Sequence, residues 1–264
     1  MKKTWIALAL VLVLLLTACG KEVAQSDVAG TIETIATTAT EAPAEAGKVE
    51  VATEPAVEEP FEETAEDSAA AEAPEGKTVT MGRIEGGKYI NEYAGYACEL
   101  DSNWVFHGAE ELQQLPENVK ELLADSEMAD LMEGVVQFTD MFAENVNDLA
   151  NVNVLYQKMS MQERLAFSLL SDDEILDEVL LNKDMMIDTY AQIGMNVESI
   201  EKGTVTFLGE ERTALLTKGD VQGAPYWQVQ VFDYHLGQYC VTLTVSSYLE
   251  DKTADVLNLF YPVQ

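Results

Sequence analysis

The sequence predicts an α+β fold in which helices are placed around a mostly antiparallel sheet. Three observations support this prediction. Most runs between residues 79 and 245 alternate apolar and polar residues with a period of two, and they end at glycine-containing turns. Two Ser-x-x-Glu patterns are typical of helix starts. The helical runs fall at three points along the chain instead of following every strand, which is the arrangement expected for an α+β domain.

The first strands follow one another closely. We predict them at residues 79–84, 88–93, 96–100 and 104–106, separated by Gly86-Gly87, Ala94-Gly95 and Asp101-Ser102-Asn103. Short breaks of this composition are turn signals. The four strands are therefore expected to form an antiparallel meander.

The next part of the chain mixes both element types. Pro116 can occupy the first turn of a helix at 117–124. Residues 135–143 are rich in β-branched and aromatic side chains, which favours a strand. A turn at 145–148 should lead to a returning strand at 152–156.

Two capping boxes predict the starts of two helices. Ser160 with Glu163 places one start at Met161, and Ser171 with Glu174 places the other at Asp172. The second helix is expected to be long and to end near Gly194.

A helical wheel of this second helix separates an apolar stripe from an acidic face. A core-facing stripe is typical of a helix on a globular domain. The stripe contains Ile175, Val179, Met186, Tyr190 and Ile193, and the acidic face contains Asp173, Asp177, Asp184 and Asp188. These aspartates could hold a cation, but solvation by water is favoured.

The period of two returns after Gly194. Strands are predicted at 197–200, 205–208 and 212–217. Residues 226–234 and 239–245 flank Leu236-Gly237 and give the clearest hairpin signal. A last helix is expected to start near Asp251, to carry Val256, Leu257 and Phe260, and to stop at Pro262.

The N-terminus has the order of a bacterial lipoprotein signal. Lys2 and Lys3 precede 14 residues from Trp5 to Ala18 that are mostly apolar, and Leu16-Thr17-Ala18-Cys19 follows as a lipobox-like sequence. A spanning helix needs about 20 apolar residues. Residues 1–18 are therefore expected to be a removed signal peptide, with Cys19 the lipidated residue. An ordinary secretory signal cut nearby is the alternative.

Composition divides the remaining chain into a tether and a domain. Residues 20–77 are built from Ala, Glu, Thr and Pro and carry a net charge of −12, so they cannot bury enough apolar surface to offset chain entropy. We predict a disordered acidic tether over 19–77, including the lipidated Cys19, and one globular domain over 78–264. A coil of this length spans about 40 Å.

Two cysteines remain after Cys19. One disulfide is possible in an exported domain. However, Cys240 shares a strand face with Thr242 and Thr244, away from the apolar side chains of its strand. Two free buried thiols at Cys98 and Cys240 are favoured over a bond between them.

One set of residues in the domain resembles the opening of a PsbP-type domain. These are Tyr89-x-Asn91-x-Tyr93-x-Gly95-Tyr96, followed by Leu100-Asp101-Ser102-x-Trp104. The central helix, the hairpin and the closing helix continue the same plan over roughly 79–262. The chain is similar to surface lipoproteins of clostridia-like bacteria that carry such domains behind acidic tethers. The resemblance implies an α/β/α sandwich around an antiparallel sheet and no catalytic centre. Residues 109–134 depart from it as additional helical sequence, and PsbP's role in photosynthesis does not carry over.

The sequence contains no recognisable catalytic or cofactor motif. We find no nucleophile elbow, zinc motif, phosphate loop or calcium loop. His107 and His235 are each expected to be structural. Trp104 is expected in the core, whereas Trp227 and Tyr226 could lie in the core or stack on sugar rings. Catalytic, metal and cofactor residues are therefore predicted to be none.

These observations give one preferred function and two alternatives. A net charge of −32 leaves few groups to neutralise nucleic-acid phosphates, so no nucleic-acid partner is expected. The preferred hypothesis is a non-enzymatic surface module, held on the outer face of the cell membrane through Cys19, that binds a protein or another envelope ligand. The alternatives are the solute-capturing component of an importer and a carboxylate-based cell-wall hydrolase.

Overall fold

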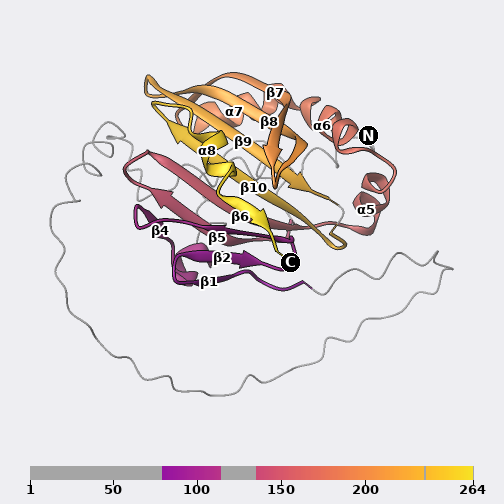
Figure 1. The fold of residues 1–264 in the computed structure, drawn as a ribbon. Helices are drawn as coiled ribbons and strands as arrows, with labels where there is room; N and C mark the ends of the chain where they lie inside the picture. The colour runs from indigo at the N-terminus through magenta and orange to yellow at the C-terminus, as the bar shows by residue number, and fades with distance from the viewer. Residues whose placement is uncertain (1–78, 114–134, 235, 264) are drawn as a thin grey trace.

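The computed structural model describes residues 79–113, 135–234 and 236–263, which form three layers (Figure 1). A seven-stranded antiparallel sheet with the order β4-β5-β6-β10-β9-β8-β7 lies in the middle, and a four-stranded sheet with the order β1-β2-β3-β11 lies on one side. The strands are β1 (Arg83–Glu85), β2 (Lys88–Asn91), β3 (Tyr96–Glu99), β4 (Trp104–Phe106), β5 (Gln137–Asn145), β6 (Ala150–Lys158), β7 (Met195–Phe207), β8 (Glu210–Val221), β9 (Ala224–Asp233), β10 (Tyr239–Tyr248) and β11 (Phe260–Pro262). The helices are α5 (Met161–Phe167), α6 (Asp172–Leu180), α7 (Lys183–Gln192) and α8 (Thr253–Leu257).

The predicted meander is confirmed for three strands and wrong for the fourth. Strands β1, β2 and β3 pair in sequence order, and Gly86 with a φ of 58° and Gly95 with a φ of 81° provide left-handed turn residues. Strand β4 instead leaves this sheet and pairs with β5, with Trp104 opposite Asn145. The change of sheet follows the turn at 101–103, which a local pattern cannot distinguish from an ordinary hairpin turn.

The predicted hairpin of β9 and β10 is confirmed, with Leu243 opposite Val231. Two strands predicted at 197–200 and 205–208 are instead one strand, β7, which pairs along its length with β8. A β-bulge between Val197 and Ser199 interrupts the pairing. Gly219 allows a close approach there, because a Cβ atom at this position would lie 2.2 Å from the Asn196 carbonyl oxygen.

Both capping boxes are confirmed. The Ser160 and Ser171 side chains accept hydrogen bonds from the backbone N–H groups of Glu163 and Glu174, and each glutamate side chain bonds back to the serine backbone. The long second helix is wrong: the chain forms α6 and then α7, which ends before Gly194. Asn182 has a φ of −106° and a ψ of 19°, and its N–H bonds back to Val179. Asparagine is a weak helix former, so the break falls at this residue.

The last helix is shorter than predicted. Helix α8 starts at Thr253, close to the predicted start near Asp251. Its N-cap residue is Lys252, which makes no side-chain capping bond, and the Thr253 backbone N–H donates to the Asp251 carboxylate at 3.1 Å. Phe260 and Pro262 do not belong to this helix. They lie in β11, which pairs with β3. The predicted helix at 117–124 lies outside the described residues.

Two apolar cores lie on opposite faces of the seven-stranded sheet. Alternation along β10 sends Val241, Leu243 and Val245 toward the four-stranded sheet and α8, whereas Cys240 faces the core beneath α5, α6 and α7. The α+β class with mostly antiparallel strands therefore holds. The α/β/α sandwich is not confirmed, because one face of the central sheet is covered mainly by strands.

The preference for free buried thiols is confirmed. Cys98 and Cys240 are both unpaired and buried, and they belong to different cores. Burial raises the pKa of the Cys98 thiol to about 12. Both thiols therefore stay protonated at neutral pH and are poor nucleophiles.

None of the helices within residues 79–113, 135–234 and 236–263 has the length and apolar character that crossing a bilayer requires.

Candidate binding face

Three neighbouring strands place neutral polar side chains on the helix-facing side of the seven-stranded sheet. The opposite side of the same strands carries valines such as Val152, Val229 and Val245, which belong to the core under the four-stranded sheet. We call the polar set the amide face. It consists of Asn151 and Asn153 from β6, Gln228 and Gln230 from β9, and Thr244 and Ser246 from β10.

The register of the sheet aligns these residues into two rows. Thr244 of the central strand is opposite both Asn153 and Gln230, and Ser246 is opposite both Asn151 and Gln228. All six residues are buried, and Asn151 is the most exposed of them at 5%. Burial of six neutral polar side chains in one patch requires an account of their hydrogen bonds.

One end of the amide face has a closed hydrogen-bond network. The Tyr190 hydroxyl of α7 donates to Gln228 Oε1 at 2.7 Å. Gln228 Nε2 donates to the Tyr226 hydroxyl at 2.7 Å and approaches Ser246 Oγ at 3.4 Å. Because α7 packs over this end, the sheet and the helix satisfy each other's polar groups.

The other end is buried but lacks such a network. Among the described residues, Asn153 Nδ2 and Oδ1, Asn151 Oδ1 and Gln230 Oε1 are buried atoms with no hydrogen-bond partner. The Gln230 amide nitrogen does donate to Thr244 Oγ1, at 3.3 Å. Leaving a buried polar group unsatisfied costs about 1–3 kcal/mol. These buried atoms therefore form a concentrated set of donors and acceptors without partners.

A histidine between two carboxylates lies at the rim of this face. Glu144 of β5 is opposite Asn151 and so extends one polar row. His107 Nε2 lies 3.0 Å from Glu144 Oε2, and His107 Nδ1 lies 3.3 Å from Glu111 Oε2. Hydrogen bonding to Glu144 is the main cause of a raised His107 pKa, with smaller contributions from Glu111.

The raised pKa of His107 predicts a pH-dependent contribution to stability. The folded state binds the proton more tightly than the unfolded state, so the contribution is complete below the unfolded pKa of about 6.5 and is lost as pH rises through the folded pKa. Replacing His107→Gln should therefore flatten the fall in unfolding free energy above pH 6.5, measured by urea titration at several pH values. An unchanged slope would contradict this assignment.

A second polar cluster joins the two sheets. Asp140 is only 6% exposed and accepts hydrogen bonds from the Tyr89 hydroxyl at 2.5 Å, from Asn91 Nδ2 at 3.0 Å, and from the Gly82 backbone N–H at 2.9 Å. Asn91 Nδ2 also donates to the Tyr156 hydroxyl at 2.7 Å. Burial is the main cause of a raised Asp140 pKa, and the hydrogen bonds oppose it. Because donors surround this carboxylate, it links the N-terminal strands to β5 as a structural element.

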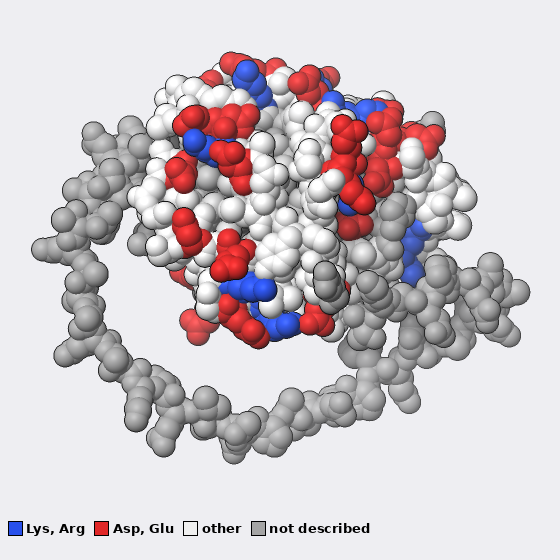
Figure 2. Space-filling model, in the orientation of Figure 1, with Lys and Arg blue, Asp and Glu red and all other residues white. Residues whose placement is uncertain are grey.

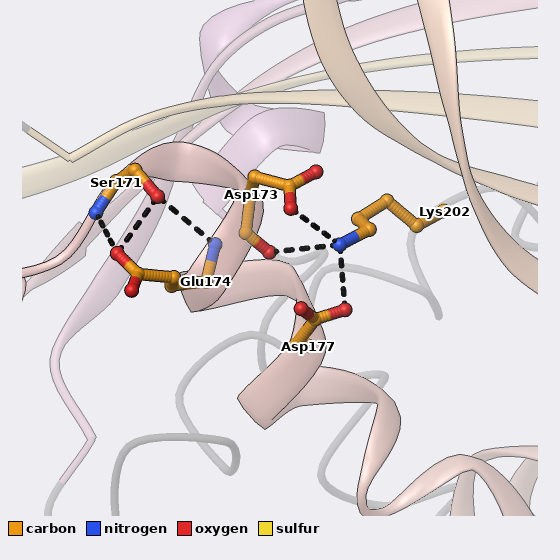
Figure 3. Close-up of polar contacts among 5 residues, drawn as sticks. All are labelled: Ser171, Asp173, Glu174, Asp177 and Lys202. Carbon is orange, nitrogen blue, oxygen red and sulfur yellow. Dashed lines mark hydrogen bonds and ion pairs between the residues drawn. The ribbon is translucent and has the colours of Figure 1, made fainter.

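On the face of the molecule that Figure 2 shows, carboxylates outnumber basic side chains, which lie scattered among them. Figure 3 shows Lys202 of β7 reaching the N-terminal part of α6, next to the capping box of Ser171 and Glu174. Its ammonium lies 2.8 Å from Asp173 Oδ2 and 2.6 Å from Asp177 Oδ1. Asp173 and Asp177, two of the four aspartates expected to be solvated, are thus paired with a lysine of this chain. The Lys202 ammonium lies where a bound cation would contact these two carboxylates. Asp184 and Asp188 are exposed as predicted.

The other residues named from the sequence are placed as follows. Trp104 is half-buried against the core that includes Tyr89 and Val245, as predicted, and Trp227 is also half-buried. Tyr226 is fully buried in the helix-side core, so it is not available to stack on a sugar at the surface. Cys19 and His235 lie outside the described residues. Within the described ranges, no group of three or more His, Cys, Asp and Glu residues is arranged to hold a metal ion.

The sequence patterns did not predict the amide face. The alternation of β10 was visible, with threonines on the face of Cys240, but polar residues on an alternating strand usually indicate solvent exposure. Only the pairing of β10 with both β6 and β9 brings Asn153, Thr244 and Gln230 together under the helices.

Comparison with known proteins identifies no family. No protein-family model matches the chain, and no curated protein is similar to it. Among solved structures, the chain is similar to the solution structure of cyanobacterial PsbP (CyanoP) from Synechocystis sp. PCC 6803, with 12% identity and a TM-score of 0.37. The similarity covers 72% of this chain and 98% of that chain. At this identity and TM-score, the likeness supports no conclusion about function.

Proposed function

We propose that the chain is a non-catalytic binding module held on the extracytoplasmic face of the cell membrane by lipid on Cys19. The observation that carries the binding role is the amide face, which concentrates six buried Asn, Gln, Ser and Thr side chains. Such groups donate and accept hydrogen bonds but do not exchange protons near neutral pH. They suit recognition of a ligand better than acid–base or nucleophilic chemistry.

The N-terminal sequence carries the anchoring role. A charged start, an apolar run and Leu16-Thr17-Ala18-Cys19 supply the order that lipoprotein processing requires. A diacylglyceryl group on Cys19 would provide two acyl chains, and stable anchoring requires more than one. The acidic tether over 20–77 would then hold the domain away from the membrane surface.

The partner proposed for this module is an envelope component or a protein and not a nucleic acid. The net charge of −32 opposes binding to phosphate backbones. Anionic lipid headgroups would also repel the acidic surface seen in Figure 2, so membrane attachment must come from the lipid alone.

We also propose a PsbP-like origin for the domain. The motif residues Tyr89 and Asn91 take part in the cluster around Asp140, and Trp104 packs against the same core. These structural roles give a physical reason for the residue types in the motif. The proposal concerns the fold alone and transfers no photosynthetic role.

The two alternative functions are less favoured. Solute-capturing components of importers usually close two lobes around a cleft, whereas the described strands form two sheets packed into one stack. A hydrolase would need two carboxyl groups flanking a cleft. The most buried carboxylate among the described residues, Asp140, is surrounded by donors of its own chain.

Metabolic labelling tests the anchoring role. Cells producing the full chain are fed an alkyne-bearing palmitate, and spheroplasts are treated with protease before the label is detected. The proposal expects lipid label on the protein and removal of the domain by external protease. A Cys240→Ser control, at a buried thiol, should be labelled like the original chain. Absence of label, or a domain protected from protease, would contradict the proposal.

A further inference from the structure

We propose that the outer edge of β7, together with the groove between β7 and α7, binds an extended basic segment of a partner protein, which adds a strand to the seven-stranded sheet. This site lies apart from the amide face, which belongs to β6, β9 and β10. It goes beyond the proposed function by naming a second binding surface and the chemistry of its partner. Two independent observations support it, an unpaired strand edge and an apolar groove beside that edge.

Strand β7 is the last strand of the seven-stranded sheet and pairs with β8 on one side. It is 13 residues long, whereas β4, at the opposite edge of the sheet, has 3 residues. Within the described part of the chain, no backbone hydrogen bond joins the outer side of β7 to another segment. Such an edge presents a row of unpaired N–H and C=O groups, which is a template for pairing with another chain. Strand β7 therefore offers main-chain hydrogen bonds to an added strand.

The groove lies where α7 passes into β7. It has a volume of about 260 Å³ and is lined by Ile187, Ala191, Gly194, Met195, Asn196 and Val197. A Cβ atom at Gly194, where φ is 82°, would meet no heavy atom within 4 Å beyond its chain neighbours, so this connection leaves the groove unfilled. The volume is below the roughly 300–1,000 Å³ of typical small-molecule sites. It suits one or two side chains of a longer ligand.

A helix beside an unpaired sheet edge is an arrangement suited to strand addition, in which main-chain bonds supply affinity and pockets for alternate side chains supply specificity. Met195 and Val197 face the core beneath the helices, so every second side chain of an added strand would enter the groove. Apolar side chains fit there. The remaining side chains would lie on the side of Glu201, whose partner Leu216 packs toward the four-stranded sheet.

The charges around the groove indicate basic side chains on the added strand. Exposed carboxylates lie on both elements that form the groove, namely Asp184, Asp188, Glu198 and Glu201. Asp188 precedes Ala191 by three residues, so the two are neighbours on the helix surface. Lys183 is the basic residue of α7, and Lys202 of β7 is already paired with two aspartates of α6. Apolar residues that alternate with Lys or Arg therefore match the groove and its rim.

The same charges oppose pairing of β7 with a second copy of this chain. Charged side chains and bulges are features by which edge strands avoid self-association. The bulge between Val197 and Ser199 contains Glu198. A second copy would bring its own Glu198 and Glu201 to an edge that is already acidic, and like charges on neighbouring strands are destabilising. The occupant is therefore a basic segment of a different protein.

Fluorescence anisotropy with the full-length protein in non-ionic detergent tests the site. The probe is a labelled peptide of the sequence Lys-Val-Lys-Val-Lys-Val, and Glu-Val-Glu-Val-Glu-Val is the acidic comparison. Two further versions of the basic peptide carry N-methyl groups, one on the valine and one on the lysine backbone nitrogens. In an extended strand these two sets of nitrogens point to opposite edges, so strand addition predicts loss of binding for one version only.

Two pairs of variants locate the site. Ala191→Arg places a long cationic side chain in the groove, and Gln192→Arg is its control, because Gln192 is the next exposed residue of α7 and does not line the groove. Glu201→Lys reverses a charge of the edge, and Glu210→Lys makes the same change at the start of β8. We expect Ala191→Arg and Glu201→Lys each to weaken binding of the basic peptide about ten-fold or more, and both controls to bind like the original chain.

Several outcomes would overturn the proposal. Equal binding by folded Ala191→Arg and Gln192→Arg would exclude the groove, and the Glu201→Lys pair decides the point if Ala191→Arg does not fold. Equal binding of the acidic peptide would exclude the assigned chemistry, and retained binding of both N-methylated versions would exclude strand addition. No binding of the basic peptide would refute the site altogether.

Light scattering of the protein alone tests the remaining occupant. A dimer that Ala191→Arg dissociates would assign the edge to a second copy of the chain and overturn the proposal. None of these results depends on lipidation of Cys19 or on the amide face, so they are distinguishable from a failure of the proposed function.

Discussion

Replacing Cys19→Ser is expected to move the protein almost completely from the membrane fraction to the soluble fraction. Each buried methylene of an acyl chain contributes about 0.8 kcal/mol to membrane binding, so loss of two chains removes the whole attachment. The acidic domain and tether provide no compensating attraction, because the net charge is −32. Fractionation by ultracentrifugation after carbonate washing measures the effect.

A matched thiol variant separates lipidation from other effects of losing a cysteine. Cys98 lies buried in β3 and has no role in the anchor, so Cys98→Ser should stay with the membrane. If the Cys19→Ser protein remained in the membrane pellet with its domain folded, attachment through this residue would be refuted.

Replacing Asp140→Ala is expected to lower the free energy of unfolding by about 3–5 kcal/mol. The change leaves two donors, the Gly82 N–H and the Tyr89 hydroxyl, without their acceptor. It also removes one of the acceptors of Asn91 Nδ2, which keeps its hydrogen bond to the Tyr156 hydroxyl. Tyr89 and Asn91 are both 0% exposed, so water cannot readily replace the carboxylate. Urea-induced unfolding followed by tryptophan fluorescence measures the loss.

An exposed aspartate provides the comparison for this prediction. Asp188 lies on the solvent side of α7, and Asp188→Ala should change stability by less than about 0.5 kcal/mol. Tyr89→Phe removes one of the three donors and should give an intermediate loss. A loss below 1 kcal/mol for Asp140→Ala would show that the cluster does not join the two sheets energetically.

Local patterns predicted most of the elements because the information lies within a few residues. The capping boxes at Ser160 and Ser171 satisfy backbone N–H groups of their own first turn. They therefore start a helix independently of tertiary contacts. The hairpin of β9 and β10 is likewise set by alternation and a short turn with Gly237 at a φ of 92°. Neither feature requires knowledge of distant parts of the chain.

The errors arise where distant pairing decides the structure. Trp104 begins a strand as predicted, but its partner Asn145 is far along the chain, so the choice of sheet could not be predicted locally. The middle of β7 has polar residues such as Lys202 that interrupt the strand pattern. Pairing with Leu215 of β8 and the ion pairs to α6 compensate for this weak local preference.

The candidate site shows the same limit more strongly. Asn153, Thr244 and Gln230 come from three strands, and none belongs to a known motif. Their alternation predicts a side of the sheet but not whether that side meets water or helices. The amide face is therefore defined by the strand order and by the burial of each residue, which local sequence patterns do not determine.

The central claim is that this chain is an acylated, membrane-held binding module, and the mass of the intact protein tests it most directly. The protein is extracted from membranes in detergent and measured by mass spectrometry, with fragmentation to define its N-terminus. We predict a chain that begins at Cys19 and carries a diacylglyceryl group on that residue. A chain that retains residues 1–18, or one that begins elsewhere and carries no lipid, would contradict the account.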